Sequence, residues 1–117
     1  MDNQINHGEI KKLIPHREPF LYLDKLVNIQ KLKNATGIKT FKINEFFFQG
    51  HFPGEPVVPG VILIETMAQT AAALIAYSLK SETFDKIVYL MNVDEAKFRN
   101  PVFPNTKVFC NVKSLRS

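Results

Sequence analysis

The feature that most limits how this sequence can fold is an apolar run from Val61 to Leu79, VILIETMAQTAAALIAYSL, whose only carboxylate is Glu65. Good helix formers make up most of the run, and apolar side chains surround nearly its whole circumference, which predicts a helix buried on several sides. Its length is close to the ~20 residues that cross a bilayer. A span would place Glu65, Gln69 and Thr70 in lipid, where an ionisable group is costly. We therefore expect no membrane span and a helix enclosed by protein.

Strand-like segments flank this run on both sides. Phe20 to Ile29 and Ala35 to Ile43 are rich in β-branched and aromatic residues, and Lys33-Asn34 between them predicts the turn of an antiparallel hairpin. After the helix, Lys86 to Phe98 and Thr106 to Leu115 show strand-like patterns again. This order predicts an α+β domain in which an antiparallel sheet surrounds one helix.

Two shorter signals complete the pattern. Asn6 followed by Glu9 is typical of a helix cap, and Ile10 begins a helical spacing that Pro15 stops, so a short N-terminal helix is expected. Between Asn44 and Gly60 the chain has three Pro and three Gly, which exclude both a long helix and a central strand. That segment is predicted to be a shaped loop.

Length and composition exclude several classes of protein. The 117 residues allow one core, so we expect a single domain over residues 1–117. Lys and Arg outnumber Asp and Glu by 15 to 11, but no dense basic run with exposed aromatics appears, so no nucleic-acid partner is expected.

Cys110 alternates with Val108 and Val112 and is interpreted as a small buried hydrophobe. With one Cys and no leader-like N-terminus, we expect a cytoplasmic protein. No sequence motif predicts a metal or nucleotide cofactor.

The loop and the start of the apolar run carry the residues that could do chemistry. Burying a carboxylate without a partner is costly, so Glu65 is expected either to be hydrogen-bonded or to be protonated. The alternative is a helix face on which Glu65 and Gln69, one turn apart, meet water. A neutral His51 could take a proton while Glu65 gives one, which is a pair suited to elimination. At Gly60, where the helix begins, free backbone N–H groups could polarise a carbonyl oxygen.

Three separated motifs then resemble one family. They are PHREPFLYLD from Pro15 to Asp24, NEFFFQGHFPGEPVVPGVILIETMAQ from Asn44 to Gln69, and AKFRNPVFP from Ala96 to Pro104. In this order, and with fourteen residues from His51 to Glu65, they resemble the (3R)-3-hydroxyacyl acyl-carrier-protein dehydratases of bacterial fatty-acid synthesis. Glu65 followed by TMAQ is closer to the dehydratase without isomerase activity than to the bifunctional enzyme. The resemblance implies the hot-dog fold, a long central helix wrapped by an antiparallel sheet.

The resemblance also implies roles for individual residues and partners. His51 matches the family's catalytic histidine, Glu65 its catalytic carboxylate, and Gly60 the glycine whose N–H holds the thioester carbonyl. The family places the His and Glu of one site on two subunits, so a homodimer with shared active sites is implied, and a trimer of dimers is left open. The partner is acyl carrier protein, whose phosphopantetheine arm carries the substrate, and no separate cofactor is implied.

Further residues are predicted on weaker grounds. Phe52, Val61 and Gln69 are predicted to contact substrate, and Lys97 and Arg99 to meet the acidic carrier protein, although solvated charges explain these two equally well. His16 and Arg17 precede the first strand, where a structural or subunit-contact role is favoured over catalysis.

Departures from the family leave alternatives open. Asn105 replaces a Gly in the family's turn, and only a local change is expected because Asn tolerates the left-handed conformation. The family continues for about two more strands beyond the segment that begins at Thr106, whereas this sequence stops at Ser117, so the last strands are expected to be missing and a sheet edge to be open. A hot-dog thioesterase and a noncatalytic acyl-binding or assembly module are the competing interpretations.

Overall fold

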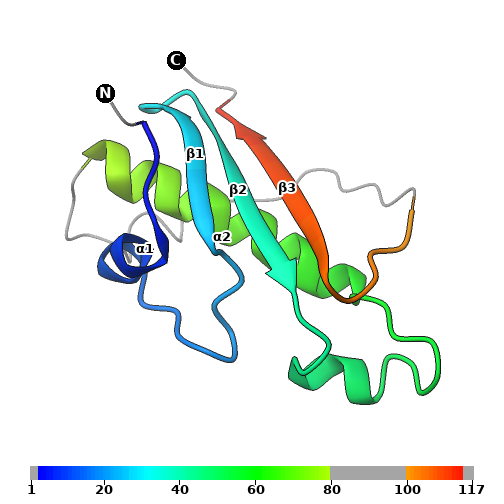
Figure 1. The fold of residues 1–117 in the computed structure, drawn as a ribbon. Helices are drawn as coiled ribbons and strands as arrows, with labels where there is room; N and C mark the ends of the chain where they lie inside the picture. Colours follow the sequence, from blue (N-terminus) through cyan, green and yellow to red (C-terminus); the bar gives the residue numbers. More distant parts are fainter. Residues whose placement is uncertain (1–2, 80–99, 115–117) are drawn as a thin grey trace.

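An antiparallel sheet with a long helix lying across one face forms the architecture (Figure 1). The computed structural model describes residues 3–79 and 100–114. The sheet has the order β1-β2-β3, and β3 pairs with β2 along its whole length although the long helix separates them in the chain. The elements are α1 (His7–Leu13), β1 (Lys25–Gln30), β2 (Asn34–Phe41), the short 3-10 helix η1 (Phe46–Gln49), α2 (Gly60–Leu79) and β3 (Thr106–Lys113). The α+β prediction is confirmed.

The N-terminal helix forms as its capping signal predicts. The Asn6 side chain accepts a hydrogen bond from the Glu9 N–H, and the Glu9 carboxylate accepts one from the Asn6 N–H. This reciprocal pair satisfies two donors that a helix start otherwise leaves open. α1 then buries Ile10, and Ile14 follows it into the same interior.

The first predicted strand begins later than expected. β1 starts at Lys25, and residues 20–24 lie outside the sheet although their hydrophobic pattern was interpreted as strand. The physical reason is that Phe20 and Tyr22 direct backbone groups at the Gln69 side chain, which takes the place of a neighbouring strand. The turn also differs, because it comprises residues 31–33 and Asn34 already opens β2.

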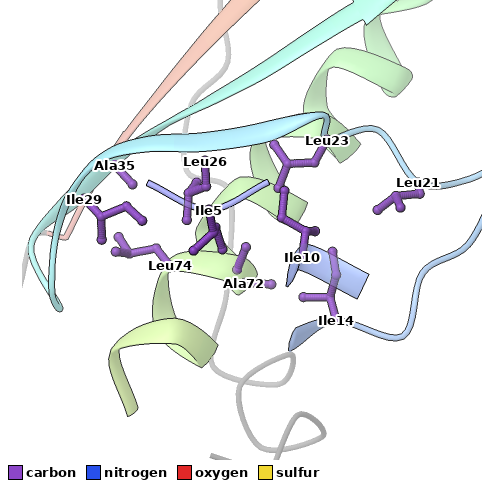
Figure 2. Packing of buried hydrophobic residues seen from close by; sticks show 11 residues of the cluster. Ile5, Ile10, Ile14, Leu21, Leu23, Leu26, Ile29, Ala35, Ala72 and Leu74 are labelled. Atoms are coloured by element: carbon purple, nitrogen blue, oxygen red, sulfur yellow. The ribbon is translucent and has the colours of Figure 1, made fainter. Parts of the chain in front are cut away.

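An aliphatic cluster fills the interior between α1, the sheet and the second half of α2. Figure 2 shows Leu26 and Ile29 of β1 facing Ala72 and Leu74 of α2, with Ile10 of α1 closing one side. Such apolar burial contributes roughly 25 cal/mol per Å² removed from water. The cluster comprises Ile5, Ile10, Ile14, Leu21, Leu23, Leu26, Ile29, Ala35, Ala72, Ala73 and Leu74.

An aromatic cluster fills the other end, beneath the first half of α2. Phe47 of η1 lies at its centre and meets Tyr22, Phe41 and Phe48 with ring centroids 4.6–6.3 Å apart. Offset and edge-on ring pairs of this kind are favourable beyond their buried area. Val58 completes the cluster. Residues 44–60 were predicted only as a loop, but they include η1, whose Phe47 and Phe48 hold that loop against the core.

The helix packs tightly against Gly37 of β2. A Cβ built at this position would overlap Thr70 Oγ1 and would lie 2.7 Å from Leu23 Cδ1. Only a residue without a side chain fits here. The approach explains why Thr70, in the middle of an apolar helix, is completely buried.

The last strand follows the predicted alternation. Cys110 is the buried residue of β3, as expected, and burial raises the pKa of its thiol, against a smaller opposing effect of a hydrogen bond with Thr70. Asn105 enters the strand with φ of 64°, the left-handed conformation predicted for the turn. The predicted strand from Lys86 to Phe98 lies outside the described residues.

By its length and apolar composition α2 could cross a membrane, and it is the one described helix that is long and apolar enough to do so. The buried core helix of a globular protein can have the same length and composition. Ala72 and Leu74 pack against the sheet, and Gln69 is enclosed and hydrogen-bonded to the backbone of the chain. The structure therefore accounts for the apolar composition of α2 through packing against protein.

Candidate active site

The loop that carries His51 is held in place by backbone hydrogen bonds at both ends. The His51 N–H donates to Phe47 O of η1, and the His51 carbonyl accepts from the Val57 N–H at 2.9 Å. Between them, Phe52 and Glu55 exchange reciprocal backbone hydrogen bonds, and Gly54 supplies the positive φ of 83° that the tight loop requires. The loop is therefore an extension of the aromatic core.

The imidazole of His51 has a defined orientation. Nδ1 lies 2.9 Å from Val57 O, and the ring stacks on Phe52 with centroids 4.0 Å apart. Because a carbonyl oxygen can only accept, Nδ1 carries the hydrogen in the neutral ring and Nε2 carries the lone pair. The arrangement presents Nε2 as a base.

Phe52 also lines an open groove of about 610 Å³ next to this histidine. The groove is bordered on one side by the loop and on the other by the segment that leads into β3, and the two sides are joined by the hydrogen bond from Val58 N to Val102 O. Phe52 and Phe103 expose 53% and 54% of their surface, so the lining is largely apolar. The lining residues are Phe52, Gly54, Glu55, Pro56, Val57, Pro101, Phe103 and Pro104.

The start of α2 presents backbone donors to the same loop region. The helix begins at Gly60, as predicted, and Pro59 O accepts hydrogen bonds from the Ile62 and Leu63 N–H groups. The N–H groups of Gly60 and Val61 precede these and have no acceptor among the described residues. Val61 is 71% exposed, so this helix end is open to a ligand. Such an end combines unpaired donors with the positive end of the helix dipole.

Glu65 occupies the second turn of α2 and is only half enclosed. Its side chain is 44% exposed, and its Oε2 accepts a hydrogen bond of 3.0 Å from Gln69 Nε2. The expectation of a buried carboxylate is therefore wrong for the single chain, whereas the expected hydrogen-bonding partner is present. The alternative in which Glu65 and Gln69 both face water is also wrong, because Gln69 is 1% exposed. The two side chains remain hydrogen-bonded to each other, with Gln69 enclosed and Glu65 at the edge of the surface.

Gln69 is bound at both ends of its amide. Its Oε1 accepts from the Tyr22 N–H at 2.7 Å, and its Nε2 donates to Phe20 O at 2.8 Å and to Glu65. These bonds tie α2 to the segment before β1. Sequence reasoning predicted a substrate contact at this residue, yet its polar atoms are used within the chain.

The motif that begins at Pro15 contributes its own histidine to this corner. His16 Nε2 lies 3.6 Å from Glu65 Oε2, the same oxygen that Gln69 contacts. The neighbouring Arg17 donates to the carbonyls of Lys11, Ile14 and His16, which gives it the structural role that was favoured for it. Spacing along the sequence could not reveal that residues 16 and 65 meet.

Sequence reasoning also missed a charged group at the edge of the aromatic cluster. Lys39 is 8% exposed although it lies in a strand, and its Nζ is 3.4 Å from Glu45 Oε1 and 3.9 Å from Asp24 Oδ1. The hydroxyl of Tyr22 is buried without a hydrogen-bond partner among the described residues. Burial raises the pKa of Tyr22, and the negative charges of Glu45 and Glu65 add to this. The alternation in β2 places Lys39 on the buried face with Ala35, Gly37 and Phe41, but it does not show which acidic residues lie beside it.

The described chain does not bring His51 and Glu65 into contact. His51 belongs to the loop after η1, whereas the described partners of Glu65 are Gln69 and His16. Lys97 and Arg99 lie outside the described residues. Within residues 3–79 and 100–114, no group of His, Cys, Asp and Glu could hold a metal ion.

Comparison with known proteins identifies the family. The model of the FabA-like domain matches residues 14–117, which include His51, Gly60 and Glu65. The chain belongs to the FabA-like family. The hot-dog fold that the resemblance implied is therefore confirmed, and the long helix α2 on the antiparallel sheet is its described part.

Several curated relatives of this FabA-like chain are named 3-hydroxyacyl-[acyl-carrier-protein] dehydratase FabZ. The protein from Geotalea uraniireducens is 47% identical over 94% of this chain and 76% of its own length. That from Acidiphilium cryptum is 49% identical over 92% of this chain and 66% of its own. That from Caulobacter vibrioides is 46% identical over 100% of this chain and 74% of its own. The chain thus spans about two thirds to three quarters of the length of these relatives.

Proposed function

We propose that this protein removes water from (3R)-3-hydroxyacyl thioesters on acyl carrier protein and forms the trans-2-enoyl product in fatty-acid biosynthesis. The observation that carries the proposal is the orientation of His51, whose Nδ1 is held by Val57 O so that Nε2 is available as a base. Relatives of the same family that are named for this reaction support it. The half-exposed carboxyl group of Glu65 provides the complementary acid.

The proposed reaction needs no reactant other than the substrate and these groups of the protein. His51 Nε2 takes the proton from the carbon next to the thioester carbonyl, and the electrons of that bond form the new double bond. The carbon–oxygen bond at the 3-position breaks, and the proton of Glu65 converts the departing hydroxyl into water. Negative charge that develops on the carbonyl oxygen is stabilised by the N–H groups of Gly60 and Val61 at the helix end.

The proposal includes two copies of the chain in each site. Its support is that His51 and Glu65 have separate partners within one chain, together with the family resemblance, which places the two groups of one site on two subunits. We propose a homodimer on this basis, and a trimer of such dimers remains an open arrangement. Neither Glu65 nor His51 could then complete a site in an isolated chain.

A complementation experiment tests the shared site. Mixing His51→Ala chains with Glu65→Gln chains, each inactive alone, is expected to restore about a quarter of wild-type activity. Half of randomly formed dimers are mixed, and each mixed dimer has one complete site of two. The required control is mass spectrometry of the mixture, which must show that subunits have exchanged before activity is measured. No recovery under those conditions would mean that each chain holds its own site.

We propose acyl carrier protein as the partner and the cytoplasm as the compartment. The relatives are named for a substrate on that carrier, and the net charge of +4 suits an acidic partner. The substrate arrives on the phosphopantetheine arm, so the proposal needs no separate cofactor. Lys97 and Arg99 remain the residues proposed to meet the carrier.

A single assay separates this function from its competitors. Incubation with a 3-hydroxyacyl carrier protein, with the enoyl product and free thiol followed in parallel, is expected to yield the enoyl product only. Thiol release without dehydration would favour a thioesterase. Tight binding of the acyl carrier without either product would favour a noncatalytic module.

A further inference from the structure

We infer that Lys39 is a positioning residue for the proposed dehydration, because its buried ammonium group holds Glu45 and so fixes η1, to which the His51 loop is bound. The role rests on the proposed function, since His51 is the base of that reaction. Among the described residues, the charged groups that face the Lys39 side chain are Glu45 and Asp24, so its effect on His51 is expected to pass through a carboxylate.

The ammonium group of Lys39 is almost fully enclosed. The side chain is 10% exposed, and its Nζ also lies 5.5 Å from the centre of the Phe41 ring. A charge with so little water around it must be balanced by partners of opposite charge. Glu45 is 3.4 Å away and 19% exposed, whereas Asp24 is 3.9 Å away and 42% exposed. Water screens the Asp24 contact more strongly, so Glu45 is the main partner.

Glu45 transfers this contact to η1. Its Oε1 faces Lys39, while its Oε2 accepts a hydrogen bond from the Lys42 N–H at 2.7 Å. In return the Glu45 N–H donates to Lys42 O at 3.0 Å, and Glu45 O accepts from the Phe48 N–H of η1 at 3.2 Å. Glu45 directly precedes η1, and its side chain makes no cap for that helix. Both carboxylate oxygens therefore attach the start of η1 to the end of β2.

η1 in turn holds the loop that carries the base. Phe47 O accepts the hydrogen bond from the His51 N–H at 3.1 Å, so a shift of η1 moves the histidine with it. The aromatic cluster also holds η1, but apolar contacts have no directional requirement, whereas Lys39 fixes one carboxylate. A general base must lie within reach of its proton, and a displacement of about 1 Å can cost about 100-fold in rate. Lys39 therefore acts on the rate through the place of His51 Nε2.

The main variant is Lys39→Met, which keeps the apolar stem and removes the ammonium group. We expect kcat for dehydration to fall about 10- to 100-fold while KM changes less than about three-fold, because the displaced base is needed in the transition state. The variant also leaves Glu45 without its cation, so the melting temperature should fall. An unchanged kcat, or a loss confined to KM, would overturn the positioning role.

The double variant Lys39→Met with Glu45→Gln separates positioning from damage to the fold. It removes both members of the ion pair, so the melting temperature should return toward the wild-type value. The amide in place of the carboxylate can still accept from the Lys42 N–H, but no cation holds it. We therefore expect kcat to stay within about three-fold of the Lys39→Met value. A kcat that recovers together with the melting temperature would show that Lys39 only stabilises the fold, and would overturn the inference.

Asp24→Asn is the matched control, because it removes the more distant and more exposed carboxylate beside Lys39. An amide oxygen there can still accept from the Thr40 N–H, as Oδ2 of Asp24 does at 2.8 Å. Because Asp24 lies before β1 and not at η1, we expect kcat to change less than about two-fold. A loss as large as that in Lys39→Met would show that Glu45 is not the route to His51, and would contradict the inference.

A spectroscopic measurement keeps this inference separate from the proposed function. The backbone amide resonance of His51, which reports on the hydrogen bond to Phe47 O, should shift in Lys39→Met and in the double variant and stay in place in Asp24→Asn. An unchanged resonance in Lys39→Met would show that Lys39 does not hold the loop. A wild-type chain that shows no dehydration would instead overturn the proposed function, and the resonance would still decide whether Lys39 holds the loop.

Discussion

The two halves of α2 rest on different interiors. Its second half packs through Ala72, Ala73 and Leu74 into the aliphatic cluster, where every member is apolar. Its first half rests on the aromatic cluster around Phe47, and there the contacts include hydrogen bonds and buried charge.

The difference indicates that the two regions have different roles. Apolar contacts stabilise the fold without directional requirements, whereas polar contacts hold particular atoms in particular places. The aromatic end positions His51 through Val57 and Glu65 through Gln69. Within the described residues, neither His51 nor Glu65 is positioned by the aliphatic end, so changes there should affect stability and leave chemistry intact.

The largest expected effect is at the aromatic end and falls on activity. His51→Ala should lower turnover by about 100- to 10,000-fold, the usual range for a lost general base. Because the side chain makes one hydrogen bond to the loop, the melting temperature should change little. Dehydration kinetics and thermal unfolding measure the two quantities. The control is His7→Ala in α1, which should retain turnover, and near-normal turnover in His51→Ala would remove this residue from the mechanism.

The opposite outcome is expected at the aliphatic end. Leu74→Ala should reduce the free energy of unfolding by about 2–5 kcal/mol through lost burial and a cavity, while kcat per folded chain stays near wild type. Leu79→Ala on the same helix is the control, since Leu79 is 51% exposed and should cost below about 0.5 kcal/mol. Denaturant unfolding gives both values. If Leu74→Ala lowers kcat as strongly as it lowers stability, the two halves are not independent.

A smaller effect is expected where α1 joins the aliphatic cluster. Asn6→Ala removes the cap of α1 and should cost about 0.5–2 kcal/mol of stability, without a change in turnover. Asn6→Asp keeps the acceptor for the Glu9 N–H and should restore most of that loss. Equal stabilities for the Ala and Asp variants would show that the cap contributes nothing measurable.

The smallest effect concerns an exposed ion pair and depends on pH. Burial opposes the ionisation of Glu18 and is the largest single influence on it, but the hydrogen bonds and charges of His7 and Lys11 together outweigh burial and hold the pKa of Glu18 below the ordinary 4.5. A lowered pKa means that ionised Glu18 stabilises the fold above that value, and that the contribution is lost as pH falls through the lowered pKa. Glu18→Gln should therefore cost under about 1 kcal/mol near neutral pH and nothing in strong acid. Thermal unfolding across pH checks this, and a cost that persists in acid would assign it to packing.

Much of the candidate site could be predicted from local sequence. His51 and Gly60 lie where Gly and Pro spacing placed a loop and a helix start, because those residues restrict the backbone regardless of the surroundings. The helix cap at Asn6 and the left-handed turn at Asn105 were predictable for the same reason. Each of these depends on residues within a few positions.

Other features depended on partners far along the chain. The hydrophobic pattern of residues 20–24 favoured a strand, but Gln69 satisfies that backbone instead. The apolar surroundings of Glu65 favoured burial, yet it faces outward far enough to be 44% exposed. Lys39 lies on the buried face of β2, and only the tertiary structure shows that the carboxylates of Asp24 and Glu45 lie beside it there.

The sequence by itself determined the family, the long helix, the loop that carries His51 and the cap of α1, since each follows from local propensity or from motifs in order. The tertiary structure decided which nitrogen of His51 is free and which atoms clamp Glu65. It also decided that a Gln forty-seven residues beyond Tyr22 would replace a strand partner. The physical reason is that hydrogen bonds between distant residues depend on how helix and sheet pack, and packing is a property of the whole interior.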